Sequence, residues 1–184
     1  MSKIYQQIKL QVEDPSLAIS RAEEYFLRSS FKIEEKKNNY IKIKRGSLFL
    51  NMLTFNPLKW KSNIVLRIED NGLTADFEVV TVGQMPTHSE EKAWIDFIDH
   101  FKQHIETGDF SFIEANRNSI RTVRKDSLRY VGWAFLGGLL GGLPSGIIGH
   151  MIGVDNLVII GSAGGALAYM SYKIQAEKDR KAPK

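Results

Sequence analysis

Three side chains on one predicted helix are of types that bind metal ions. Asp96, His100 and His104 are spaced at i, i+4 and i+8, so they lie on one side of that helix. Two histidines four residues apart can share a metal ion. The metalloprotease pattern His-Glu-x-x-His is absent, however, because Phe-Lys-Gln separates the two histidines. We therefore expect this side of the helix to be an ordinary solvated surface, with no metal site.

Other residue patterns that carry catalysis are also missing from the sequence. The chain of 184 residues contains no cysteine, which excludes disulfides, cysteine-ligated metals and thiol catalysis. There is no phosphate-binding P-loop, no Gly-x-Ser-x-Gly nucleophile elbow, and no carboxylate pair at a recognisable acid–base spacing. These observations predict a non-enzymatic protein that holds no cofactor.

The positive charge is concentrated on either side of a nearly uncharged stretch. The formal net charge is +4, but residues 1–116 carry a net charge of −2. Residues 117–129 carry +4 and residues 173–184 carry +3, whereas residues 130–172 contain a single charge, Asp155. The basic residues form no recognisable nucleic-acid-binding motif. Their position fits membrane topology better, so we expect no nucleic-acid partner.

The uncharged stretch is long enough for two membrane spans. A spanning helix needs about 20 apolar residues, and we place spans at residues 130–150 and 156–174, joined by a turn at 151–155. His150, Asp155 and Asn156 are the polar residues available at the far headgroup layer. Both flanks are basic, which predicts that both termini are cytoplasmic. A buried hairpin in a soluble protein is the alternative, but it would need a polar face that this stretch lacks.

Small residues recur every four positions in these two segments. Residues four apart share one face of a helix, and small ones let another helix approach closely. The spacing resembles the glycine-zipper arrangement of two-span membrane hairpins, which implies close packing within the hairpin or between copies. Glycines on two adjacent rows of the first span favour self-association. Pro144 should kink this span and free the carbonyl of Leu140, which Ser145 could satisfy. The expected packing glycines are Gly137, Gly138, Gly141, Gly142, Gly146, Gly149, Gly153, Gly161, Gly164 and Gly165.

The sequence predicts an α+β domain over residues 1–108. Alternating apolar residues predict a strand at 4–12, and Asp14-Pro15 begins a helix that runs to about Arg28. Four strands follow, at 31–36, 40–44, 63–69 and 73–82, the last two joined by Asp70-Asn71-Gly72. A capping box at 87–90 then begins a helix that ends near Gly108. The order β-α-β-β-β-β-α predicts an antiparallel sheet with both helices on one face.

Two segments allow more than one interpretation. Residues 46–61 are rich in apolar side chains and form either a loop or short helix that dips into lipid headgroups, with Trp60 at the interface, or a further strand. Residues 109–129 form either a basic amphipathic juxtamembrane helix or a solvated connector. Residues 130–174 would be the membrane hairpin and 175–184 a basic cytoplasmic tail. The expected membrane-interface residues are Trp60, Arg117, Arg121, Arg124, Lys125, Arg129 and Lys173.

The sequence therefore predicts an integral protein of the plasma or inner membrane with a cytoplasmic domain. Its expected partners are the lipid bilayer and either further copies of itself or another membrane protein. Self-association through the glycine-rich spans would suit a scaffold, a regulator or a component of a pore-like assembly. The alternative is a tethered module that binds a lipid or small apolar ligand, with residues 46–61 controlling access.

Overall fold

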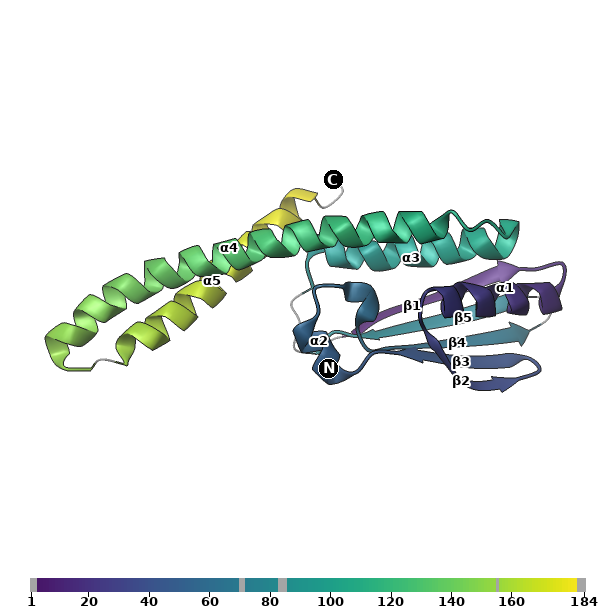
Figure 1. Ribbon diagram of the computed structural model, residues 1–184, viewed down its shortest axis with the longest axis horizontal. Helices are drawn as coiled ribbons and strands as arrows, with labels where there is room; N and C mark the ends of the chain where they lie inside the picture. Colours follow the sequence, from purple (N-terminus) through teal and green to yellow (C-terminus); the bar gives the residue numbers. More distant parts are fainter. Residues whose placement is uncertain (1–2, 70–71, 83–85, 155, 182–184) are drawn as a thin grey trace. The chain divides into compact units, whose positions relative to one another are not determined.

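The computed structural model describes residues 3–69, 72–82, 86–154 and 156–181. The chain divides into two compact units (Figure 1). The first comprises Met1–Pro86 with Glu90–Val123, and the second comprises Thr87–Ser89 with Arg124–Lys184. The first unit contains a sheet and the helices that pack on it. The second contains most of one long apolar helix, which begins in the first unit, and the whole of another.

The sheet is five-stranded and antiparallel, as the alternating sequence pattern predicts. Its strands are β1 (Lys3–Gln11), β2 (Lys32–Lys37), β3 (Tyr40–Arg45), β4 (Ser62–Glu69) and β5 (Gly72–Val80). They lie in the order β1-β5-β4-β3-β2. The β4–β5 hairpin closes with Glu69 opposite Gly72. Asp70 and Asn71 of the predicted turn lie outside the described residues.

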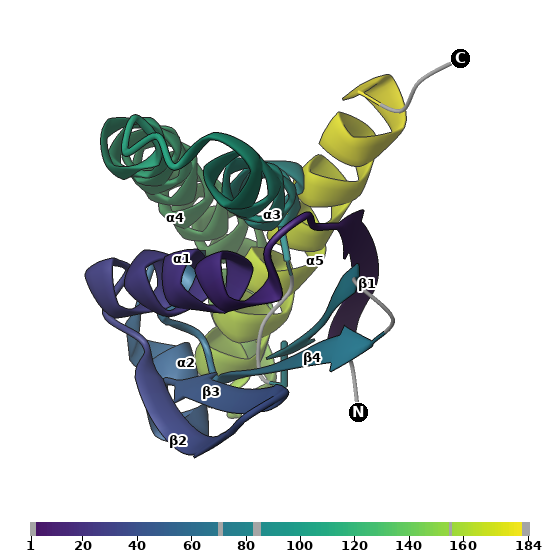
Figure 2. The same cartoon turned by 90° about the vertical axis from the view of Figure 1, so that its right-hand side faces the viewer.

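Two helices cover the same side of this sheet (Figure 2). Helix α1 (Pro15–Arg28) begins where the Asp14 carboxylate accepts hydrogen bonds from the backbone nitrogens of Ser16 and Leu17, at 2.8 and 3.1 Å. Helix α3 (His88–Thr107) carries Trp94, Phe97, Phe101 and Ile105 on its buried stripe. Both helices were expected at these places, because an N-cap aspartate and a 3.6-residue apolar period are local signals.

Aromatic rings fill the space between the helices and the sheet. The ring centroid of Tyr25 lies 5.0 Å from that of Phe97, 5.4 Å from that of Phe101 and 4.4 Å from that of Phe112. The Tyr25 hydroxyl donates a 2.6 Å hydrogen bond to the carbonyl oxygen of Phe97. Burial raises the pKa of Tyr25 well above its ordinary value, so the hydroxyl remains a donor.

The expected linker at 109–129 is largely helical, and its first part belongs to this core. Helix α4 (Phe112–Ile152) starts at Phe112, whose side chain is buried beside Tyr25. Ile120, further along the same helix, is partly buried and packs against the same core. Phe112 and Ile120 therefore contribute to the folded domain, while Arg117 and Arg121 are exposed.

The segment between β3 and β4 is not a further strand. Residues Leu48–Leu53 form the short helix α2, and Pro57–Lys59 form a single 3₁₀ turn. Trp60, expected at a membrane interface, is wholly buried, and Leu58 is buried beside it. The expectation for Trp60 is wrong because the chain turns at Asn56 and Pro57 back into the core, where the Trp94 indole nitrogen donates to the carbonyl oxygen of Pro57 at 3.1 Å.

A matched pair of truncations checks this core. Phe101 is fully buried and Phe49 is 71% exposed. We expect Phe101→Ala to lower the free energy of unfolding by about 3–5 kcal/mol, because it removes a buried ring and leaves a cavity. The same truncation at Phe49 should change it by less than about 0.5 kcal/mol. Urea titration of the full chain in a mild detergent, followed by circular dichroism, measures both; equal losses would contradict the assigned core.

Candidate functional site

His100 and His104 of α3 form hydrogen bonds with different partners. His104 is 1% exposed, and its Nδ1 lies 2.7 Å from the carbonyl oxygen of Asp109. His100 Nδ1 lies 2.8 Å from the side-chain oxygen of Asn116. The expected solvated surface is therefore wrong for His104, which helps to close the end of α3. Among the described residues, no group of three or more His, Cys, Asp or Glu side chains could hold a metal ion.

The second unit contains the part of α4 that follows Val123 and helix α5 (Leu157–Lys181), which form a hairpin. Both helices are long and apolar enough to cross a membrane. The large side chains on their surfaces are exposed; Phe135, Leu143 and Ile160 are 66–68% exposed. Gly153 adopts a left-handed backbone with φ of 71° in the connecting turn, and the Val154 nitrogen donates to the carbonyl oxygen of Gly149 at 2.8 Å. Asp155 lies outside the described residues.

One row of glycines brings the two backbones into direct contact. A Cβ atom placed on Gly141 would lie 2.2 Å from the carbonyl oxygen of Gly161. A Cβ on Gly137 would lie 2.4 Å from the carbonyl oxygen of Gly165, and one on Gly165 would lie 2.3 Å from that of Gly137. Real Cβ atoms do not approach carbonyl oxygens so closely. Glycine is therefore required at these four positions for the two helices to lie this close together.

The second row of glycines on α4 faces the same partner helix. A Cβ on Gly142 would lie 2.1 Å from the Ser162 hydroxyl oxygen, and one on Gly146 would lie 3.3 Å from a Val158 methyl group. Gly138 has looser contacts, the nearest being the carbonyl oxygen of Ser162 at 3.5 Å. Two adjacent rows are therefore used within one hairpin, and they do not by themselves require a second copy.

The remaining expected packing glycines have different surroundings. Gly149 lies against the turn, where a Cβ would be 2.5 Å from the carbonyl oxygen of Val154. Gly153 supplies the left-handed turn conformation, and an added Cβ there would meet no described atom within 4 Å. The same is true of Gly164, which faces away from α4.

Helix α4 continues through Pro144 without interruption. The Ser145 hydroxyl donates a hydrogen bond to the carbonyl oxygen of Gly141, four residues earlier. The expectation that Ser145 would satisfy Leu140 is therefore wrong by one residue. Ser145 also lies against Gly161, where an added Cβ would overlap its side chain.

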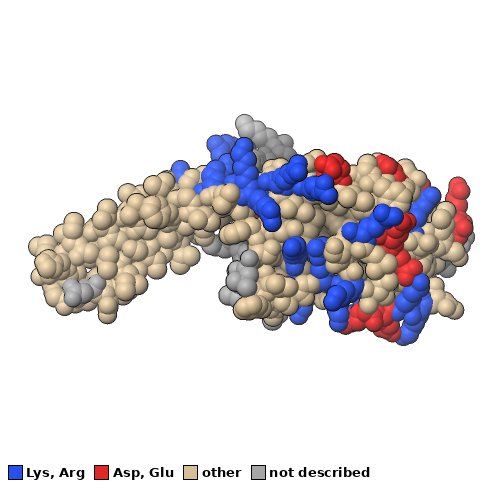
Figure 3. All heavy atoms as spheres, viewed as in Figure 1, with Lys and Arg blue, Asp and Glu red and all other residues tan. Residues whose placement is uncertain are grey.

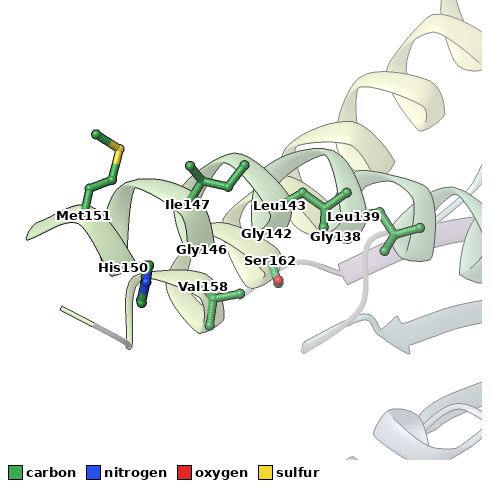
Figure 4. A pocket seen from close by; sticks show the side chains of 10 residues that line it. All are labelled: Gly138, Leu139, Gly142, Leu143, Gly146, Ile147, His150, Met151, Val158 and Ser162. Carbon is green, nitrogen blue, oxygen red and sulfur yellow. The ribbon is translucent and has the colours of Figure 1, made fainter. Parts of the chain in front are cut away.

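An apolar groove runs along one side of the hairpin (Figure 4). Its volume is about 550 Å³. Gly138, Gly142 and Gly146 of α4 leave it open, and Leu143, Val158 and Ser162 are among the residues that line it. Gly138 and Gly146 are partly exposed and Gly142 is buried against Ser162. The absence of side chains at these positions leaves space between the larger residues that line the groove.

A polar cluster joins the two helices at the opposite end of the hairpin from its turn. The Glu177 carboxylate is 4% exposed, and one guanidinium nitrogen of Arg129 reaches its two oxygens at 2.8 and 2.9 Å. The Tyr130 hydroxyl donates to the same carboxylate at 2.8 Å. Asp126 lies 3.2 Å from the Arg129 guanidinium. The cluster therefore joins the Arg129 guanidinium to one carboxylate from each helix, Asp126 of α4 and Glu177 of α5.

Lys173 lies among aromatic rings near this cluster. Its ammonium nitrogen is 5.3 Å from the ring centroid of Tyr169, 5.8 Å from that of Trp133 and 6.0 Å from that of Tyr172. Cations among Trp and Tyr rings are typical of membrane–water interfaces. The other expected interface cations of α4, Arg117, Arg121, Arg124 and Lys125, are exposed. Figure 3 shows Lys and Arg gathered along this part of α4, while the rest of the hairpin is free of coloured atoms on the face drawn.

Tyr130 and Glu177 are partners of Arg129 that no local sequence pattern indicated. The predicted hairpin could have indicated this contact. In two antiparallel helices, a residue just before the first span lies beside a residue just after the second span. Comparison with known proteins adds no identification. No protein-family model matches the chain, and no curated protein sequence matches it significantly.

The buried carboxylate makes the cluster testable. Arg129→Gln removes the charged donor to Glu177, and we expect it to destabilise the hairpin by about 1.5–3 kcal/mol, the usual effect of losing a hydrogen bond to a charged group. Arg124→Gln alters an exposed cation on the same helix and should cost less than about 0.5 kcal/mol. Titration with denaturing detergent, followed by circular dichroism, compares the two. Similar behaviour of both variants would show that the cluster does not hold the helices together.

Proposed function

We propose that the chain is a non-enzymatic membrane-anchored protein whose hairpin spans a bilayer and holds the α+β domain at its cytoplasmic face. The observation that carries the proposal is the construction of the hairpin. Glycines at positions 137, 141, 161 and 165 bring the backbones together, and the large apolar side chains point outward. In water these side chains would remain exposed at a cost of about 25 cal/mol for each Å². In hydrocarbon the same surface is solvated, and the helices satisfy their own backbone groups.

The distribution of polar groups supports the same proposal. The Arg129–Glu177 pair and Lys173 lie at one end of the hairpin, beyond its apolar middle. Charges are tolerated at the headgroup layer and are costly at the bilayer centre. The basic flanks at 117–129 and 173–184 favour retention of both ends in the cytoplasm.

The proposed topology predicts which positions a membrane-impermeant thiol reagent can reach. Because the chain has no cysteine, single variants carry a unique label. In sealed inside-out vesicles, Arg117→Cys and Asp179→Cys should react, whereas Met151→Cys, at the exposed turn, should react only after the bilayer is opened. Reaction of all three positions without opening would contradict a spanning hairpin. Reaction of only one terminus would contradict two complete spans.

Association between copies is the second element of the proposal. The groove beside Gly138, Gly142 and Gly146 has the apolar lining and the small floor residues that suit a further helix. A membrane-anchored domain that assembles in this way would act as a scaffold, a regulator or a component of a pore-like assembly.

The groove gives a substitution that tests association without disturbing the hairpin. A Cβ on Gly138 makes only ordinary contacts, so Gly138→Leu should fill the groove while α4 and α5 stay packed. We expect it to weaken association by about tenfold, a loss of about 1.4 kcal/mol. Gly132→Leu is the control, since a Cβ there meets no described atom within 4 Å and Gly132 does not line the groove. Chemical crosslinking at a series of protein-to-lipid ratios measures both.

Two results would count against association through the groove. A chain that remains monomeric at every ratio would remove association altogether. Equal weakening by both leucine variants would move it to another surface of α4. Gly141 and Gly142 are unsuitable for this test, because a side chain at either would strike α5 of the same molecule.

The ligand-binding alternative lacks a comparable observation. The space between α1, α3 and the sheet holds closely packed rings, with Phe26 5.1 Å and Phe77 5.7 Å from Phe101 between centroids. We therefore do not propose the α+β domain as a carrier of an apolar ligand.

A further inference from the structure

The segment between β3 and β4, residues 46–61, leaves the sheet and returns to it at nearly the same place; we call it the excursion. Gly46 has a left-handed φ of 69°, and a Cβ on it would lie 2.5 Å from the carbonyl oxygen of Lys59 and 2.8 Å from the backbone nitrogen of Lys61. The two ends of the segment therefore cross in direct backbone contact. Any larger residue at Gly46 would push them apart.

A buried asparagine fixes the helix inside this excursion. Asn51 is fully buried; its amide nitrogen donates to the carbonyl oxygen of Val80 at 2.7 Å, and its side-chain oxygen accepts from the Lys61 nitrogen at 2.6 Å. The Ser47 hydroxyl accepts from the Leu50 nitrogen at 3.2 Å and caps α2. Helix α2 is thus held from beneath by polar contacts to the sheet.

The outward side of the excursion is apolar. Leu48 is 42% exposed, Phe49 71%, Leu50 49% and Phe55 56%, and these four residues are called the α2 patch. Their exposed surface contributes little to the core, so polar residues there would leave the fold intact. A rigidly presented group of exposed apolar side chains is typical of a surface that meets another apolar phase.

The stretch of sequence that carries the α2 patch contains cations and no carboxylates. Residues 36–68 contain eight Lys and Arg residues and no Asp or Glu. Five of these eight cations pair with carboxylates that lie outside residues 36–68. Lys59 is exposed at the end of the segment between β3 and β4. Apolar side chains flanked by cations match the boundary between acyl chains and anionic headgroups.

We propose that the α2 patch inserts into the headgroup–acyl boundary of an anionic phospholipid bilayer. The inference rests on the membrane anchorage proposed above, because a tethered domain meets lipid at high effective concentration and a small patch is then sufficient. The bilayer is favoured over a protein partner because the segment that carries the patch, residues 46–61, contains Lys59 and Lys61 and no carboxylate. The domain would thereby hold one fixed face toward the membrane that anchors it.

Spin labels on the full-length chain test this contact. Leu50→Cys and Leu17→Cys are matched, because the two leucines are 49% and 47% exposed and belong to the same unit. The protein is reconstituted in vesicles of phosphatidylcholine and phosphatidylglycerol, and label collisions with oxygen and with a water-soluble nickel chelate are compared. The label at 50 should favour oxygen, as a lipid-exposed site does, and the label at 17 should favour nickel. Replacing phosphatidylglycerol by phosphatidylcholine should raise nickel accessibility at 50.

A third label separates the two proposals. Ile160→Cys reports the hairpin, because Ile160 is 68% exposed and does not line the groove, and it should favour oxygen if the hairpin lies in lipid. Nickel accessibility at 50 equal to that at 17, with 160 in lipid, would overturn the insertion of the patch and leave the anchor standing. Nickel accessibility at 160 would overturn the anchor. Shielding of 50 from both reagents, with spin–spin broadening that grows with protein density, would assign the patch to a second copy and overturn the bilayer contact.

Discussion

The direct approach of two helix backbones at Gly137, Gly141, Gly161 and Gly165 is the constraint on which the hairpin depends. Once the backbones lie this close, side chains are excluded at these four positions, and small ones such as Ser145 and Ser162 pack beside them. The large apolar residues of α4 and α5 must then stand on the outside of the pair. An arrangement with small residues inside and large ones outside reverses the pattern of a water-soluble bundle. The proposal of a lipid environment follows from this reversal more than from hydropathy alone.

The same approach sets the positions of the polar residues at the other end of the hairpin. With the glycine contacts fixed, α5 has one register along α4, and that register brings Glu177 level with Arg129 and Tyr130. A carboxylate at 4% exposure needs such partners, because burying an unpaired charge is costly. Glycine contacts and the ion pair thus determine the register together. Changing either one would require α5 to slide or rotate.

Local patterns predicted the elements of this protein, whereas contacts between distant residues decided their details. The Asp14 cap, the strand alternation and the stripe of α3 are readable within a few residues, and the antiparallel sheet followed from them. Residues 46–61 were ambiguous because a short apolar run fits either a strand or a buried helix. The contact that decides for α2 joins Asn51 to Val80, 29 residues away, and no local period encodes it. His104 is a similar case, since its burial depends on Phe112 and Tyr25.

Large apolar side chains that are not buried in the folded core need another apolar environment to explain why they are exposed. In the first unit, rings such as Phe97 and Phe101 are accounted for by their neighbours, whereas Phe49 and Leu50 are held outward by a helix whose polar anchor faces inward. In the second unit, the glycine contacts between α4 and α5 likewise hold the large apolar residues of both helices outward. Both surfaces are therefore built features, because specific inward contacts hold the apolar side chains out. Basic residues lie beside each surface, Lys59 near the α2 patch and Arg129 and Lys173 at the end of the hairpin. One anionic bilayer could solvate the apolar side chains of both surfaces and attract the basic residues beside them. For this reason we propose a single lipid environment for the two units.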